Sequence, residues 1–198
     1  MNTLNFFFFS NQIEARLGFC DVELARMASS IPELVADIKL VAASGFQYAG
    51  DTASDSKACT DMAKKKIYIG RSKSVSEACL SLAYEITNAK NACTFKEIQK
   101  KYLSDKAPTS SRAIEYALSI LRIEAEAVFH RSKVAISIGL QSQIKNKKYL
   151  EIVQINPNAH SCIEEIFSEM QNNGTVHHGK KKALDHYISE YFKWNRKA

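Results

Sequence analysis

The sequence contains few of the residues that break helices, with seven Gly and three Pro in 198 residues. This scarcity favours long helices over an architecture of many turns and strands. Hydrophobic residues make up 45% of the chain and charged residues 24%, which is typical of a globular protein with one sizeable core. We therefore expect an α+β fold that is mainly α, formed by a helical single domain (residues 1–198) with a small β-sheet.

Paired cysteines and long apolar runs are also missing. The five cysteines are scattered and form no CxxC pair, which argues against a disulfide framework and against a cysteine-rich zinc site. No run of ~18 apolar residues is present that would span a bilayer. The four phenylalanines Phe6 to Phe9 follow no basic segment, so we expect no Sec signal peptide. We interpret this run as a segment that docks on the body of the protein or on a partner.

Several functional motifs are absent: a Gly-rich phosphate loop, a GxSxG elbow and the usual nucleic-acid-binding patterns. The net charge of +6 permits an acidic partner, but a solvated basic surface is the better explanation, and we expect no specific nucleic acid. His177 and His178 are adjacent, yet no second histidine pair at helical spacing accompanies them. We expect no metal and no cofactor.

The clearest predicted helix lies within residues 74–91, which read SVSEACLSLAYEITNAKN. Ser74 and Glu77 form a capping box, which places the start of the helix near Val75. Apolar residues recur at steps of one, three and four and predict a broad buried face. Its members are Ala78, Cys79, Leu82, Ala83, Ile86 and Ala89.

Tyr84, Glu85 and Asn88 lie beside or within that face, where polar groups need hydrogen-bond partners or a function. The stretch LAYEITNAKN resembles the active-site helix of zincin metallopeptidases, in which two His at i and i+4 bind zinc and the Glu after the first His polarises water. Tyr84 and Asn88 occupy the two ligand positions here, and only Glu85 matches. Because a phenol and an amide are poor zinc ligands, the resemblance implies a zincin-like helix pair without zinc chemistry.

The same resemblance implies a further Glu from a following helix. RIEAEAVFHR, at residues 122–131, offers Glu124 or Glu126 for this position. An ordinary amphipathic helix with one partly buried Glu explains the stretch equally well. If Glu85 and Glu124 approach each other, we expect a shared proton or a partner such as Arg122, Arg131 or Tyr84 between them and not a metal ion.

The remaining elements are predicted from capping and turn residues. We expect N-terminal helices over 11–45, short strands and a mobile loop over 46–70, central helices over 75–138, and a C-terminal strand and helices over 150–198. Ser30 with Glu33 and Thr94 with Glu97 predict further capping boxes, and Gly45 and Gly139 predict helix ends.

The C-terminal part contains three predicted elements. Residues 150–155 are expected to form an edge strand or to finish a helix, and Asn156 with Pro157 predicts the start of the next helix. Residues 180–194 predict a basic amphipathic helix with Trp194 near its end. We expect this helix to pack on the body, although contact with a partner or a membrane surface is an alternative.

We interpret the chain as a protein-binding protein without catalytic activity. Its general character, more than any motif, resembles bacterial virulence effectors of the type VI secretion system, of the EvpP kind. The resemblance implies a protein made in the bacterial cytoplasm and exported without a Sec signal into a host cell. Its partner would be a host target or a component of the secretion apparatus.

Two other classes of function remain open. A hydrolase would use Glu85 with Glu124 as an acid and base pair. A cysteine-dependent enzyme would use Cys20 with His130 or His160, although a buried, inert thiol is the simpler interpretation of Cys20. An immunity or adaptor protein would bind a cognate toxin. The sequence leaves the oligomeric state open.

Overall fold

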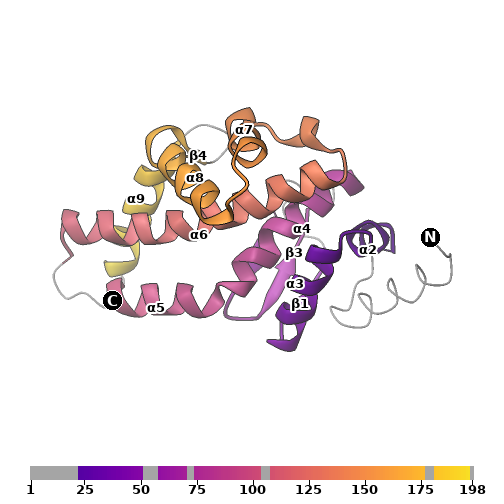
Figure 1. The fold of residues 1–198 in the computed structure, drawn as a ribbon. Coiled ribbons are helices and arrows are strands. Elements are labelled where there is room, and N and C mark those ends of the chain that lie inside the picture. The colour runs from indigo at the N-terminus through magenta and orange to yellow at the C-terminus, as the bar shows by residue number, and fades with distance from the viewer. Residues whose placement is uncertain (1–21, 51–57, 71–73, 104–107, 177–180, 197–198) are drawn as a thin grey trace. The chain divides into compact units, whose positions relative to one another are not determined.

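The computed structural model describes residues 22–50, 58–70, 74–103, 108–176 and 181–196 (Figure 1). Within them the chain forms eight α-helices, one short 3₁₀ helix and two small β-sheets. The predicted class, α+β and mainly α with a small sheet, is confirmed. No helix among these residues is long and apolar enough to cross a membrane. The predictions on Phe6 to Phe9, Cys20, His177 and His178 fall outside the described residues, as do those on residues 11–21 and 51–57.

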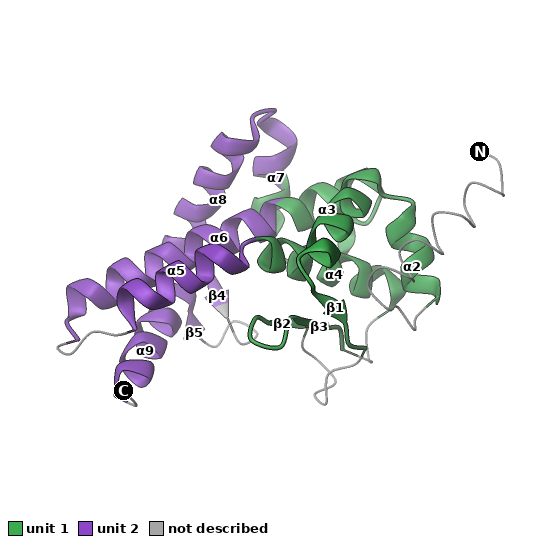
Figure 2. Ribbon diagram, turned by 90° about the horizontal axis from the view of Figure 1, so that it is seen from below, with its two compact units in different colours: residues 1–90, 130–150 green, residues 91–129, 151–198 purple. Residues whose placement is uncertain are grey.

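The chain divides into two compact units (Figure 2). Unit 1 comprises Met1–Lys90 and His130–Leu150, and unit 2 comprises Asn91–Phe129 and Glu151–Ala198. Two helices contribute residues to both units, α6 (Ser110–Ser137) and α7 (Lys147–Ile155).

Within its described residues, unit 1 contains three complete α-helices and a three-stranded sheet. The helices are α2 (Val22–Ser29), α3 (Pro32–Ala43) and α4 (Val75–Lys90). The strands are β1 (Gln47–Tyr48), β2 (Cys59–Asp61) and β3 (Lys66–Tyr68), in the order β1-β3-β2. Helix α4 contacts α2, α3, β2 and β3, so it lies at the centre of this unit.

The sheet confirms two predicted strands and adds a third. Strand β3 pairs in parallel with β1 and antiparallel with β2. We predicted a mobile loop where β2 lies, and this prediction is wrong for Cys59–Asp61. The residues CTD carry no alternation of apolar side chains, so their strand conformation comes from pairing with the edge of β3.

Helix ends in unit 1 follow the capping predictions in part. The backbone N–H of Glu77 donates to Ser74 Oγ at 3.2 Å, and α4 begins at Val75 as predicted. The capping box predicted at Ser30 is wrong, because Ser30 Oγ donates instead to the carbonyl O of Met27 at 2.7 Å. A Ser after a helix can satisfy its hydroxyl on the preceding turn, and α3 then starts at Pro32 without a side-chain cap.

Unit 2 is organised around a cluster of aromatic rings. Its complete helices are α5 (Ala92–Tyr102), α8 (Ala159–Asn173) and α9 (Ala183–Asn195), and its strands are β4 (Thr175–Val176) and β5 (Lys181–Lys182). The ring centroid of Tyr116 lies 6.1 Å from that of Tyr102 and 5.9 Å from that of Tyr191. Tyr191 is fully buried. The predicted packing of the last helix on the body is therefore confirmed.

Some predicted boundaries after α4 are wrong, and one pair of alternatives is decided. Residues 150–155 finish helix α7, which is the second predicted alternative, and form no strand. Helix α5 begins at Ala92, so Thr94 lies inside the helix and does not cap it. Helix α8 is capped by Asn158, whose Oδ1 accepts from the N–H of Ser161 at 3.0 Å.

The N-cap of α8 is Asn158 and not the predicted Asn156, because the side chain of Asn156 forms a different hydrogen bond. Asn156 Oδ1 accepts from the N–H of Asn158 at 3.0 Å, which forms a turn before the helix. The β4–β5 pair had no predicted counterpart, since its two-residue strands are too short to give a periodic signal.

Candidate functional site

A row of buried polar side chains runs along α4. Ser81, Glu85 and Asn88 are 5%, 6% and 7% exposed, and their spacing of i, i+4 and i+7 places them on one face of the helix. Tyr84 lies beside this row and is half-buried. The sequence predicted Glu85 and Asn88 as members of the row. It missed Ser81, although the i, i+4 spacing to Glu85 would have identified it.

The carboxylate of Glu85 is hydrogen-bonded to the edge strand of the sheet. Thr60 Oγ1 donates to Glu85 Oε2 at 2.8 Å and lies 3.1 Å from the backbone carbonyl O of the same residue. Hydrogen bonds to an ionised group are among the stronger ones in proteins, and a buried carboxylate is costly without them. This bond connects β2 to α4. Sequence reasoning missed Thr60 because it placed the residue in a loop.

Unit 1 contains two described thiols, Cys59 on β2 next to Thr60 and Cys79 on α4. Cys59 is exposed, and partial burial together with the negative charges of Glu85 and Asp61 raises the pKa of its thiol above the ordinary value. Because the thiolate is the nucleophile, this environment makes Cys59 less reactive. Cys79 on α4 is buried as predicted, and burial raises the pKa of its thiol to about 12.

The residues at the zincin-like positions do not fit a zinc ion. Tyr84 offers a phenol and Asn88 an amide, and Glu85 already accepts a hydrogen bond from Thr60. Asn88 Oδ1 is buried and has no hydrogen-bond partner among the described residues. Within the same residues, no group of three or more His, Cys, Asp or Glu side chains lies together as metal ligands. Zinc prefers imidazole nitrogen or thiolate sulfur, which this row lacks.

The two glutamates predicted on α6 belong to unit 2 and have their own partners. Glu126 Oε2 accepts from Asn91 Nδ2 at 3.0 Å, a contact between α6 and the start of α5. Glu124 is partly buried, as predicted, and accepts a hydrogen bond from the side chain of Tyr187 on α9. Burial raises the pKa of Glu124 to about 7, and the Tyr187 bond acts in the opposite direction. Glu85 belongs to unit 1, where Thr60 is its partner.

The two histidines considered as partners of a nucleophile lie on different helices. His130 is half-buried on α6, and His160 is exposed at the start of α8. Since Cys20 lies outside the described residues, a pairing of this thiol with either imidazole stays a prediction.

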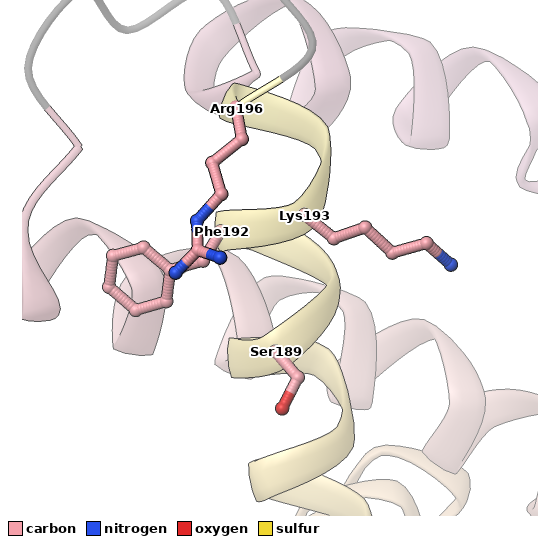
Figure 3. Close-up of a pocket in the computed structure, with 4 residues that line it drawn as sticks. All are labelled: Ser189, Phe192, Lys193 and Arg196. Atoms are coloured by element: carbon pink, nitrogen blue, oxygen red, sulfur yellow. The ribbon is translucent and has the colours of Figure 1, made fainter.

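A second feature of unit 2 is a cavity of about 510 Å³ beside the last two turns of α9 (Figure 3). Its walls among the described residues are Ser189, Phe192, Lys193 and Arg196. The cavity therefore combines an aromatic ring, a hydroxyl and two cationic side chains. The sequence predicted the basic amphipathic helix, but a cavity beside it has no signature in a single helix.

We expect Thr60→Val to lower the free energy of unfolding of unit 1 by about 1.5–3 kcal/mol, because the isosteric change removes a hydroxyl that donates to the buried Glu85 carboxylate. Urea unfolding followed by circular dichroism measures the loss. Thr87→Val is the matched control, since Thr87 Oγ1 donates to the carbonyl O of Ala83 within its own helix. An equal loss in both variants would contradict a special role of the Thr60 bond.

The described acidic candidates thus share one property, which is that each forms a hydrogen bond with another element of its own unit. Thr60 holds Glu85, Asn91 holds Glu126 and Tyr187 holds Glu124. This arrangement resembles structural carboxylates more than a free acid and base pair. The chain matches no protein-family model, no curated protein and no solved structure.

Proposed function

We propose that this chain acts by binding another protein and not by catalysis. The hydrogen bond from Thr60 to Glu85 is the observation that carries the proposal. Glu85 is the one residue that matches the metallopeptidase motif, and its carboxylate is buried and connects a strand to a helix. A general base needs access to a substrate proton, and Glu85, which carries this carboxylate, is only 6% exposed.

The proposal includes a degenerate, zincin-like origin of the α4 region and of the helix pair that α4 would form with α6. Two features support it. Strand β3 leads into α4, which is the strand-to-helix order that the resemblance requires, and Glu85 faces the edge strand β2. Tyr84 and Asn88 at the ligand positions are consistent with a metal site that has been lost.

A substitution of Glu85 tests whether the protein acts by binding or by catalysis. In Glu85→Gln the amide oxygen still accepts from Thr60, so we expect the variant to fold, to bind its partner and to keep its effect in cells. Partners are captured by crosslinking, and the complex is rebuilt from purified components and followed by size-exclusion chromatography. A folded variant that binds its partner but has lost its cellular effect would overturn the proposal in favour of a hydrolase.

We also propose that the chain is a virulence effector exported into host cells by a type VI secretion system. The resemblance to effectors of the EvpP kind supports this part of the proposal. The test compares the tagged chain in culture supernatants of a wild-type strain and of a strain without the secretion sheath. Export that does not depend on the sheath would contradict it.

A further inference from the structure

Two helix ends of unit 2 meet at the ring of Tyr102. Lys101 Nζ, at the end of α5, lies 4.7 Å from the centroid of this ring. Arg112 Cζ, in the first turn of α6, lies 4.8 Å from the same centroid. Arg112 Nη2 also donates to the carbonyl O of Lys101 at 2.8 Å. The junction of α5 and α6 therefore holds two cations next to one aromatic ring.

The last turn of α9 joins this junction. Asn195 Nδ2 donates to the carbonyl O of Tyr102 at 3.3 Å, which places the end of α9 against the end of α5 (Figure 1). Arg196 follows directly and Lys193 lies less than one turn before it, both exposed. We define the basic end of unit 2 by four residues: Lys101, Arg112, Lys193 and Arg196.

Among the described residues, acidic side chains compensate little of this positive charge. The first turn of α6 contains no acid, and the last turn of α5 contains Lys100 and Lys101. Lys193 pairs with Glu190 at 3.4 Å, but the lysine side chain is 59% exposed. Arg196 has no ion-pair partner within the part of the chain that the structure describes. Such a surface has a positive potential that attracts anionic groups.

The cavity of about 510 Å³ adds an apolar component to this surface. In Figure 3 the Arg196 side chain extends toward the Phe192 ring, and Lys193 extends to the other side of the helix. Trp194, in the same turn, is 51% exposed. Aromatic and Arg side chains around a pocket are typical of the centre of a protein interface. The volume is sufficient for one or two side chains of a bound segment.

We propose that the basic end of unit 2 and the adjoining cavity form a docking surface for an acidic segment of a protein partner. The inference rests on the proposed protein-binding function and names the chemistry of the partner. Carboxylates of the segment pair with Lys193 and Arg196, and one apolar side chain enters the cavity against Phe192.

A protein segment fits this surface better than a membrane or a nucleic acid. The apolar residues of α9 that an interfacial helix would insert into a bilayer, Tyr187, Ile188 and Tyr191, pack instead on the aromatic cluster of unit 2. The sequence contains no nucleic-acid-binding motif, and single-stranded nucleic acid would require a longer basic groove with several stacking rings.

The test uses the full chain and a short peptide of Asp and Glu with one central Leu. Isothermal titration calorimetry measures its affinity. The fluorescence of Trp194, the single Trp of the chain, reports binding at the end of α9. We expect binding that weakens as salt rises above roughly 0.1 M, together with a change in Trp194 emission. A peptide with Asn and Gln in place of the acids is expected to bind at least about tenfold more weakly.

Paired variants separate this surface from general basicity. Lys193→Gln with Arg196→Gln is expected to lower the affinity for the acidic peptide about tenfold. The matched control is Lys145→Gln with Lys148→Gln, which removes the same charge from exposed positions of unit 1 and is expected to have little effect. Circular dichroism verifies that both double variants fold.

Three results would overturn the proposal: equal losses in the two double variants, unchanged Trp194 emission on binding, or tighter binding to single-stranded DNA or to vesicles of anionic phospholipid than to the peptide. The proposed protein-binding function is tested separately from this docking surface. A captured protein partner that still binds the Lys193→Gln, Arg196→Gln variant would preserve the binding function and reject only this surface.

Discussion

Tyr191→Ala is expected to lower the free energy of unfolding of unit 2 by about 3–5 kcal/mol, the usual cost of truncating a large buried aromatic side chain. Tyr191 is 0% exposed and contacts the rings of Tyr116 and Phe192, at centroid distances of 5.9 Å and 5.3 Å. Removal of the ring leaves a cavity between α6 and α9. Urea unfolding followed by the fluorescence of Trp194, which lies on the same helix, measures the loss.

Phe167→Ala is the matched control for this experiment. Phe167 also belongs to unit 2, but it is only half-buried, beneath the guanidinium of Arg122 at 4.7 Å. We expect a loss of about 1 kcal/mol or less from this variant, because most of the cost of truncation comes from full burial. Similar losses at the two positions would contradict a central role of Tyr191 in anchoring α9.

Glu124→Gln is expected to stabilise the protein at pH 8 by up to about 3 kcal/mol and to change its stability little at pH 4.5. Burial raises the pKa of Glu124 from its ordinary value of 4.5 to about 7, and each pKa unit corresponds to about 1.4 kcal/mol. The folded protein thus prefers the protonated carboxyl, and the wild type loses stability as pH rises from about 4.5 to about 7. Gln imitates the protonated form at every pH.

The measurement is the difference in unfolding free energy between variant and wild type across this pH range. Tyr187→Phe provides the control. The hydrogen bond from Tyr187 favours the charged form of Glu124, so its removal is expected to raise the folded-state pKa further and to extend the loss of stability to higher pH. A difference between Glu124→Gln and wild type that does not vary with pH would contradict a buried, protonated Glu124.

The candidate sites were predicted unequally well. Helix α4 carries strong local signals, a capping Ser74 and apolar residues at helical spacing, and both its start and its buried face were correct. Glu85 and Asn88 were recognised because polar residues interrupt that face. Thr60, the partner of Glu85, lies 25 residues away in sequence and carries no local signal of its own strand.

Competing local hydrogen bonds explain the wrong boundaries. Ser30 and Asn156 both belong to residue types that cap helices, yet Ser30 Oγ donates to the carbonyl O of Met27 in the preceding turn, and Asn156 Oδ1 accepts from the N–H of Asn158 in a turn before α8. Residues 150–155 contain β-branched side chains that suit a strand. They instead finish helix α7, which is the second predicted alternative, with Leu150 and Ile152 buried.

The sequence by itself determined the helical character of the chain, the long helix that ends at Gly139, the buried face of α4 and the basic character of the C-terminal helix. These features depend on residues close together in the chain, through capping, periodicity and the left-handed backbone conformation of Gly139. The tertiary structure alone decided which groups the polar side chains meet. The bonds from Thr60 to Glu85, from Tyr187 to Glu124 and from Asn195 to Tyr102 join residues far apart in sequence. Such pairs form only after packing brings the helices and strands of each unit together, because burial makes an unpaired polar group costly and so selects the partner.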